Sequence, residues 1–87
     1  MYSKTTKRFW KLYAELPIEV QEAADKAYEL WEQDHNHPGL HFKKLKHYDN
    51  LFSVRINYSW RAVGLLKGDS IYWNWIGSHA EYDELFG

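Results

Sequence analysis

The spacing of apolar residues predicts two helices in the first 34 positions of the chain. The first follows Thr5 or Thr6, either of which can cap it, and runs to about Leu16. Pro17 ends that helix and opens a second, which runs from about Ile18 to Asp34. Apolar residues three and four positions apart give each helix one buried stripe: Phe9, Leu12, Tyr13 and Leu16 in the first, Val20, Ala23, Ala24, Ala27, Leu30 and Trp31 in the second.

Farther along the chain the pattern indicates β-strands. The predicted strands are His41–Tyr48, Leu51–Asn57, Trp60–Lys67 and Ser70–Ile76, and Met1–Lys4 is a candidate for a short edge strand. In the second of these, apolar and polar residues alternate, so Arg55 should face away from Val54. Gly77 should end the last strand, and Ser78 can cap a short helix over Ala80–Phe86.

This order of elements predicts an α+β fold. A helical hairpin should pack on one face of a mostly antiparallel four-stranded sheet, followed by a short C-terminal helix. Residues 1–87 are expected to form a single domain. Trp73 and Trp75 are two positions apart, so both should lie on the same face of the sheet, in the core.

Composition and charge narrow the class of protein. The chain has no cysteine and no apolar run long enough to span a membrane, which favours a cytoplasmic protein without disulfides or cofactors. The net charge of −1 hides a segregation. Residues 18–36 carry six acids and one Lys, whereas residues 37–67 carry six Lys or Arg and one acid. We therefore expect one acidic and one basic surface, which permits a polyanionic partner without requiring one.

Four histidines, at positions 35, 37, 41 and 47, raise the question of a metal site. Their spacing on a loop and a strand matches no structural zinc pattern. We therefore expect no metal.

Several stretches resemble the RelE/ParE superfamily, the toxins of bacterial type II toxin–antitoxin systems. They are FWKLYAELPIEVQEAADKAYELW, HPGLHFKKL, LFSVRINYSWRAVGLL and IGSHAEYDELF, which together cover nearly the whole chain. The two arginines separated by five residues and the terminal G-S-H-x-x-Y-D-x-L pattern carry most of the specificity. The chain departs from the family in its very short N-terminal strand and its nearly neutral charge.

The resemblance implies an mRNA endoribonuclease, often acting in the ribosomal A site, with a cognate antitoxin as inhibitor. Its partners would be the antitoxin, mRNA and the ribosome, with no membrane. In such a reaction a 2′-hydroxyl attacks the neighbouring phosphate, which requires a proton acceptor, a proton donor and cations. Arg55 and Arg61 are candidates for binding the phosphate, His79 for proton transfer, and Tyr82 for proton donation, stacking or orientation. Lys43, Lys44 and Lys46 would contact the RNA backbone.

Each of these residues also has a structural alternative. Arg55 could be an ordinary surface residue, Arg61 could pair with a nearby acid, His79 could serve a helix start, and Tyr82 could pin the last helix. The three lysines are also typical of a protected edge strand. Two other functions stay open: inhibition of DNA gyrase, as in ParE-like toxins, and a catalytically decayed toxin that acts as a binding module. Arg55 and Arg61 converge only if their strands pair in the register that puts both on one face.

Overall fold

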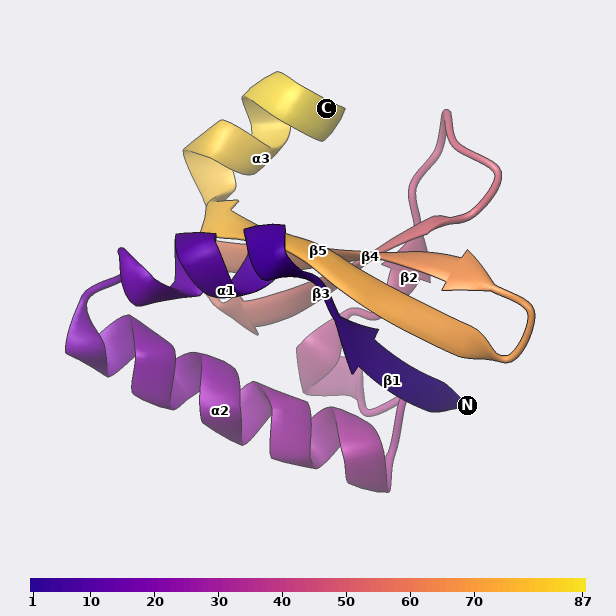
Figure 1. Ribbon diagram of the computed structural model, residues 1–87, viewed down its shortest axis with the longest axis horizontal. Helices are drawn as coiled ribbons and strands as arrows, with labels where there is room; N and C mark the ends of the chain where they lie inside the picture. Colours follow the sequence, from indigo (N-terminus) through magenta and orange to yellow (C-terminus); the bar gives the residue numbers. More distant parts are fainter.

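The computed structural model describes residues 1–87 and contains three α-helices and five strands (Figure 1). In chain order they are β1 (Tyr2–Thr5), α1 (Lys7–Ala14), α2 (Ile18–Gln33), a 3₁₀ turn η1 (Pro38–Leu40), β2 (Lys43–Lys44), β3 (Leu51–Asn57), β4 (Trp60–Lys67), β5 (Ser70–Ser78) and α3 (His79–Phe86). The predicted α+β class and the helical hairpin are confirmed.

The strands form one sheet in the order β1-β5-β4-β3-β2. Only β1 and β5 are parallel, with Tyr2 opposite Ser70 and Thr5 opposite Trp73; the other pairs are antiparallel. The sheet therefore has five strands rather than four, because the candidate N-terminal edge strand pairs with β5. From that edge the chain passes through α1 and α2 and returns to the sheet at the opposite edge, β2.

The predicted strand His41–Tyr48 is much shorter in the structure, where β2 contains only Lys43 and Lys44. His41 has a left-handed backbone with φ of 47°, so an extended strand cannot begin there. Leu45 turns inward and is 5% exposed, residues 46–47 form a turn, and residues 49–50 form a bend. The lysine-rich segment is consequently mostly loop.

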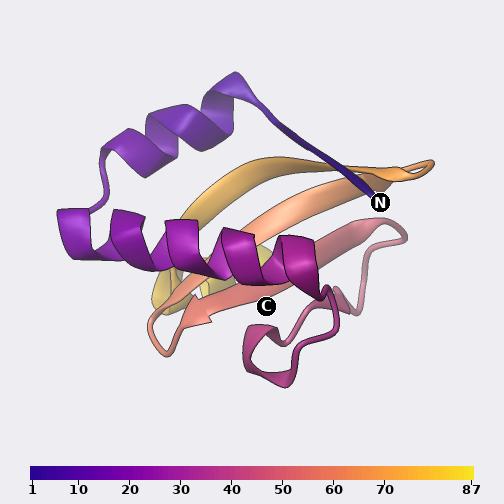
Figure 2. The ribbon, with the colours of Figure 1, turned by 90° about the horizontal axis from the view of Figure 1, so that it is seen from below.

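The helical hairpin covers one face of the sheet, as predicted (Figure 2). Thr6 caps α1 by accepting a hydrogen bond from the Phe9 backbone N–H (3.2 Å), and Pro17 precedes α2. The core of this layer joins the inner face of α2 to the sheet; its buried members are Trp31, Leu40, Val54, Ala62, Ile71, Trp73 and Ile76.

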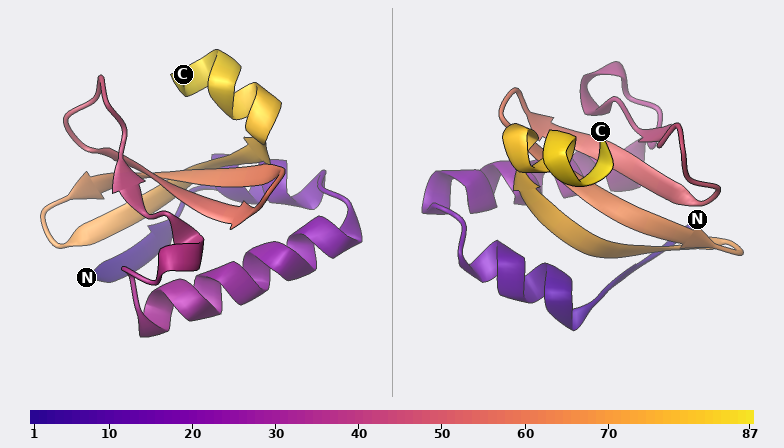
Figure 3. Two further views of the ribbon diagram at one scale, coloured as in Figure 1. Left: turned by 180° about the vertical axis from the view of Figure 1, so that it is seen from behind. Right: turned by 90° about the horizontal axis from the view of Figure 1, so that it is seen from above.

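The opposite face of the sheet carries α3 (Figure 3). A smaller core there contains Leu45, Val63 and Trp75, against which Tyr82 and Phe86 of α3 pack. The expectation that Trp73 and Trp75 share a face is therefore wrong.

A β-bulge separates the two tryptophans. Val63 of β4 is opposite Trp75, and the next residue, Gly64, is opposite Trp73, so Asn74 is the extra residue on β5. One extra residue reverses the alternation of faces along a strand. The bulge thus gives each helical layer one of the two tryptophans of β5, both 4% exposed.

Candidate functional site

Arg55 and Arg61 lie directly opposite one another in the antiparallel pair formed by β3 and β4. Paired residues in such a ladder point to the same face. Val54 and Ala62, the neighbouring pair, lie in the core under the helical hairpin, so the two arginines project from the other face, on the side of α3. The register is the one in which the arginines converge.

Arg61 is held by the turn between β3 and β4. Its Nη1 donates to the carbonyl oxygens of Asn57 (2.7 Å) and Trp60 (3.0 Å), and it lies 3.4 Å from that of Tyr58. Its Nε and Nη2 groups donate to no protein acceptor. Burial, and then the charge of Arg55, lower the pKa of Arg61, and Tyr82 and Asp83 oppose that shift. The structural alternative, in which Arg61 pairs with an acid, is not seen, since no carboxylate lies within salt-bridge distance of it.

Arg55 forms no salt bridge either, and its guanidinium carbon lies 5.9 Å from the ring centre of Tyr58. Two guanidinium groups on one face therefore lack a carboxylate partner. Like charges this close repel, and an anion placed between them would relieve the repulsion. Such an arrangement fits a phosphate group, which arginine binds through two parallel N–H donors.

His79 is the first residue of α3, next to this turn. Ser78 caps the helix by accepting from the Glu81 backbone N–H (3.1 Å), and Glu81 accepts in return from the Ser78 backbone N–H (3.0 Å). The Ser78 backbone N–H and then the Ser78 hydroxyl (3.0 Å) donate to the Glu81 carboxylate, and these two bonds lower its pKa. The His79 backbone N–H donates to the Ser59 carbonyl (2.7 Å), which ties α3 to the turn.

The imidazole of His79 is about half exposed and lies beside a carboxylate. Its Nδ1 is 3.2 Å from Oδ2 of Asp83, one helical turn later, and this is the only salt-bridge contact in the protein. A proton on Nδ1 directed at Asp83 leaves the Nε2 lone pair available to accept another proton. The contact with Asp83 therefore makes His79 a candidate acid–base group.

Tyr82 has a clear packing role. Its ring lies against Trp75 and Phe86, at centroid distances of 6.4 Å and 5.7 Å, and 6.2 Å from the ring of His79. It therefore helps to dock α3 on the sheet. Its hydroxyl forms no hydrogen bond within the protein, and it is near enough to Arg61 to affect the pKa of that group.

An open depression of about 380 Å³ lies where the turn meets the start of α3. Its lining includes two of the predicted residues and four others: Tyr58, Ser59, Arg61, Ser78, His79 and Ala80. Tyr58 and Ser59 lie between two of the predicted strands and are not among the site residues predicted from the sequence. The signal that could have identified Tyr58 is a large aromatic residue at a turn position usually filled by Gly, Asn, Asp or Ser.

The three predicted RNA-binding lysines do not form one group with the arginines. Lys43 is opposite Ser53, so it shares the face of Arg55, whereas Lys44 is opposite Phe52 and faces the other way. Lys44 also donates through Nζ to the Tyr48 carbonyl (3.2 Å). Lys46 is exposed in the following loop.

Two of the histidines outside the depression have local roles. His35 stacks on Trp31 with a centroid distance of 4.2 Å, and His37 accepts a hydrogen bond at Nδ1 from the Gly39 backbone N–H (3.1 Å). No group of three or more His, Cys, Asp or Glu side chains is placed to hold a metal ion.

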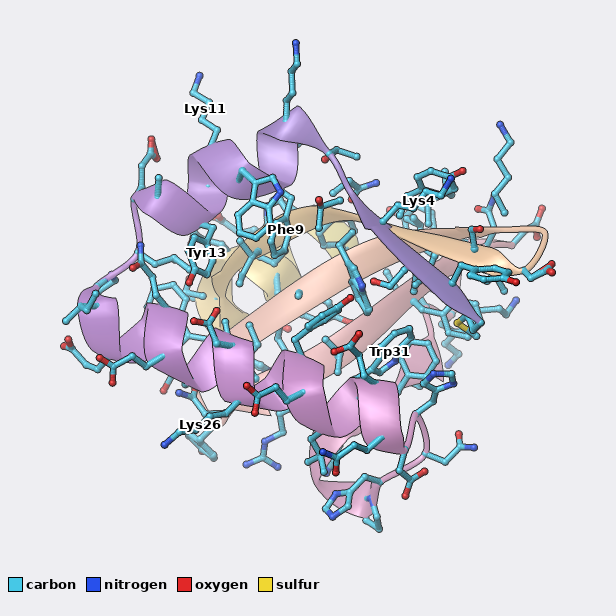
Figure 4. The ribbon with its side chains drawn as sticks, turned by 60° about the horizontal axis from the view of Figure 1, so that its bottom comes forward. Lys4, Phe9, Lys11, Tyr13, Lys26 and Trp31 are labelled. Carbon is cyan, nitrogen blue, oxygen red and sulfur yellow. The ribbon has the colours of Figure 1, made fainter.

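A larger hollow of about 520 Å³ lies on the opposite side of the sheet, between β1, α1 and α2. Figure 4 shows Phe9 and Tyr13 on the inner side of α1 and Trp31 on the inner side of α2. The hollow is lined mostly by apolar residues and contains neither arginine nor histidine. Its one cation, Lys4, lies among two carboxylates, Asp25 and Glu29, so the hollow offers no net positive charge to a phosphate. The smaller depression, which has Arg61 and His79, is therefore the candidate active site.

Comparison with known proteins places the chain in a family. The family model described as a ParE-like toxin domain matches residues 19–84. The chain belongs to this family. It is thus a toxin of the RelE/ParE superfamily, as the sequence motifs indicated. No curated protein matches this toxin in sequence.

Solved toxin structures share the fold. The RelB–RelE antitoxin–toxin complex of Methanococcus jannaschii matches with a TM-score of 0.74 and 21% identity, covering 97% of this chain and 99% of the other. A YoeB/ParE toxin from Agrobacterium tumefaciens matches with a TM-score of 0.70 and 16% identity, covering 91% and 99%. The YoeB dimer of Staphylococcus aureus matches with a TM-score of 0.62 and 13% identity, covering 84% of this chain and 90% of the other.

No helix of the toxin has the length and apolar composition needed to cross a membrane.

Proposed function

We propose that this toxin is a metal-independent endoribonuclease that cleaves mRNA, and that a cognate antitoxin neutralises it. The observation that carries the proposal is the pairing of Arg55 with Arg61 on the face that also presents His79. Neither guanidinium is neutralised by a carboxylate salt bridge. A fold that places two such cations beside an oriented imidazole has the groups that phosphodiester cleavage requires.

The phosphate would bind between the arginines. Because Nη1 of Arg61 is fixed on the turn, its remaining N–H groups are oriented before the ligand arrives, which reduces the entropy cost of binding. Arg55 makes no salt bridge and can close on the same phosphate. The acids of α2 lie on the opposite face of the sheet and do not compete for these cations.

His79 is proposed to accept the proton of the 2′-hydroxyl through Nε2, with Asp83 holding Nδ1. The 2′-oxygen then forms a bond to phosphorus as the bond to the 5′-oxygen breaks, and Tyr82 donates its hydroxyl proton to that oxygen. The products are a 2′,3′-cyclic phosphate and a 5′-hydroxyl end. The arginines stabilise the negative charge that develops on the phosphate oxygens.

The leaving-group step gives a sharp test of the role of Tyr82. An RNA whose scissile 5′-oxygen is replaced by sulfur needs no proton donor, since thiolate is a good leaving group. Tyr82→Phe keeps the ring against Trp75 and removes only the hydroxyl. We expect this variant to cleave normal RNA about 100-fold more slowly and the sulfur-substituted RNA at nearly the wild-type rate. Equal losses on both substrates would exclude Tyr82 as the proton donor.

The antitoxin partner is supported by the fold shared with RelE of the RelB–RelE complex. Co-expression with an antitoxin frame adjacent to the toxin gene should restore growth. Messenger RNA, free or on the ribosome, is the proposed substrate. Cleavage should therefore be measured with purified toxin on both, using mapping of new 5′-hydroxyl ends. If new 5′-hydroxyl ends form neither on free mRNA nor on ribosome-bound mRNA, the nuclease proposal is contradicted.

Inhibition of DNA gyrase is the competing function within the same superfamily. It requires no proton transfer by His79 and no phosphate between the arginines. Growth arrest with DNA damage and intact messages would favour it, and the Arg55–Arg61 pair would then need another explanation.

A further inference from the structure

Tyr58 lies in the turn between β3 and β4 with 82% of its surface exposed, more than any other large hydrophobic residue of the protein. An aromatic ring that buries so little area contributes almost nothing to folding. Turn positions of this kind usually carry small polar residues or glycine. The stability of the fold therefore does not explain why an aromatic residue occupies this position.

The backbone beneath this ring is fixed at three points. The Asn57 side chain accepts from the Ser59 N–H (2.9 Å), and Arg61 donates to the Asn57 carbonyl (2.7 Å). From the other side, the His79 N–H donates to the Ser59 carbonyl (2.7 Å). Tyr58 is thus an exposed ring on a rigid support, and a ligand that stacks on it needs to order little besides itself.

The surroundings of the ring are cationic. Tyr58 lines the same depression as Arg61 and His79, and the Arg55 guanidinium carbon lies 5.9 Å from its ring centre. Single-stranded nucleic acids are bound by aromatic faces next to basic groups, where the base stacks and the phosphate meets the cation.

We propose that Tyr58 is a stacking platform for one unpaired nucleobase, that of a nucleotide adjoining the phosphate held by Arg55 and Arg61. The inference rests on the proposed function and extends it: the substrate is RNA that is single-stranded at the cleavage point. Stacking sets the position of the phosphate without reading base identity, because every base offers an aromatic face.

A binding cycle tests this subsite. The probe is a short fluorescent single-stranded RNA with 2′-O-methyl groups, which cannot be cleaved, offered free and as the message of purified ribosomes. Each position is replaced in turn by an abasic nucleotide. We expect Tyr58→Ala to weaken binding about 5- to 100-fold, and Tyr58→Phe to keep it. Tyr58→Leu, apolar but without an aromatic face, should behave like the alanine variant.

Tyr2 provides the matched control. It is also exposed, at 69%, but lies opposite Ser70 at the far end of β5 from the site, so Tyr2→Ala should bind as wild type. One abasic position should weaken binding to the wild type and have no further effect on Tyr58→Ala, because the stacking partner is already missing. Additive effects at every position, or wild-type binding by Tyr58→Ala, would overturn the inference.

The outcomes also separate this inference from the proposed nuclease. RNA binding that depends on Tyr58, without cleavage of an unmodified message, would support the subsite and contradict the nuclease. RNA cleavage and RNA binding that are unchanged in Tyr58→Ala would support the nuclease and contradict the stacking subsite. A wild-type protein that binds neither form of the probe would overturn both.

Discussion

Gly77 provides a test of how closely α3 is fitted to the sheet. A Cβ at this position would lie 2.6 Å and 2.8 Å from Cζ2 and Cη2 of Trp75, and 3.1 Å from Oε1 of Glu81. Ordinary contacts are at least 3.4 Å. Trp75 is 4% exposed and surrounded by Leu45, Val63 and the rings of α3, so it cannot move aside without opening that core.

We therefore expect Gly77→Ala to reduce the free energy of unfolding by about 2 kcal/mol, in the range of other overpacked cores. For a chain of this length that corresponds to a fall of about 8 to 16 °C in the melting temperature. Because the displaced ring supports α3, the change should also move His79 away from Arg61. Urea and thermal unfolding followed by circular dichroism measure the effect.

Two further variants isolate the cause. Gly39→Ala is the matched control, since its nearest atoms, at 3.3 Å and 3.4 Å, belong only to the exposed ring of His37. It should change stability by less than about 0.5 kcal/mol. Trp75→Phe removes the part of the indole that collides with the new methyl group. In the double variant Gly77→Ala/Trp75→Phe, the loss should be smaller than the sum of the single losses by about 1 kcal/mol or more. Additive losses, or a Gly77→Ala protein as stable as Gly39→Ala, would refute the steric argument.

Three other predictions follow from the contacts. Ser78→Ala should cost about 1 kcal/mol of stability through loss of the cap, seen as a lower urea midpoint. The folded state lowers the pKa of Glu81, so this carboxylate stabilises the fold above the unfolded pKa of a glutamate and ceases to do so as pH falls through the folded value. The difference in unfolding free energy between wild type and Glu81→Gln should therefore disappear in acid. A difference that does not change with pH would contradict this. Burial and the hydrogen bond to Asp25 (2.9 Å) raise the pKa of Tyr13. The wild type should therefore be slightly more stable than Tyr13→Phe below the unfolded pKa of a tyrosine, and this advantage should disappear as alkaline pH passes the folded value. An advantage that persists at that pH would count against the hydrogen bond.

Local patterns predicted the helices and three of the strands well. The helical hairpin follows from periodic apolar stripes and Pro17, and β3, β4 and the start of α3 agree with the predicted positions within one or two residues. The pairing of β1 with β5 joins residues nearly 70 positions apart, through four residues with no distinctive pattern. A pairing between such distant residues cannot be predicted from the pattern of a short sequence segment.

The bulge at Asn74 was also beyond a periodic argument. Strict alternation puts Trp73 and Trp75 on one face, and the residue types around Asn74 do not indicate that a β-bulge occurs there. The reason becomes apparent only in three dimensions, where both faces of β5 are covered and each needs a large buried side chain.

The site was predictable in its residue types more than in its detail. Arg55 was placed on the correct face by alternation, and the resemblance to known toxins singled out Arg61, His79 and Tyr82. The bonds from Arg61 to the turn, and the position of Tyr58 beside it, depend on how two loops meet in space. Their roles in catalysis stay predictions.

The most direct test of the central claim is induced expression of the wild type beside Arg55→Ala, His79→Ala and the double variant, with growth and primer extension on a reporter message measured together. Both residues lie outside the core, so the variants should stay folded and still bind the antitoxin. We expect growth arrest with new message 5′ ends in the wild type, and neither in the double variant. Arrest with intact messages, or cleavage that persists in the folded double variant, would contradict it.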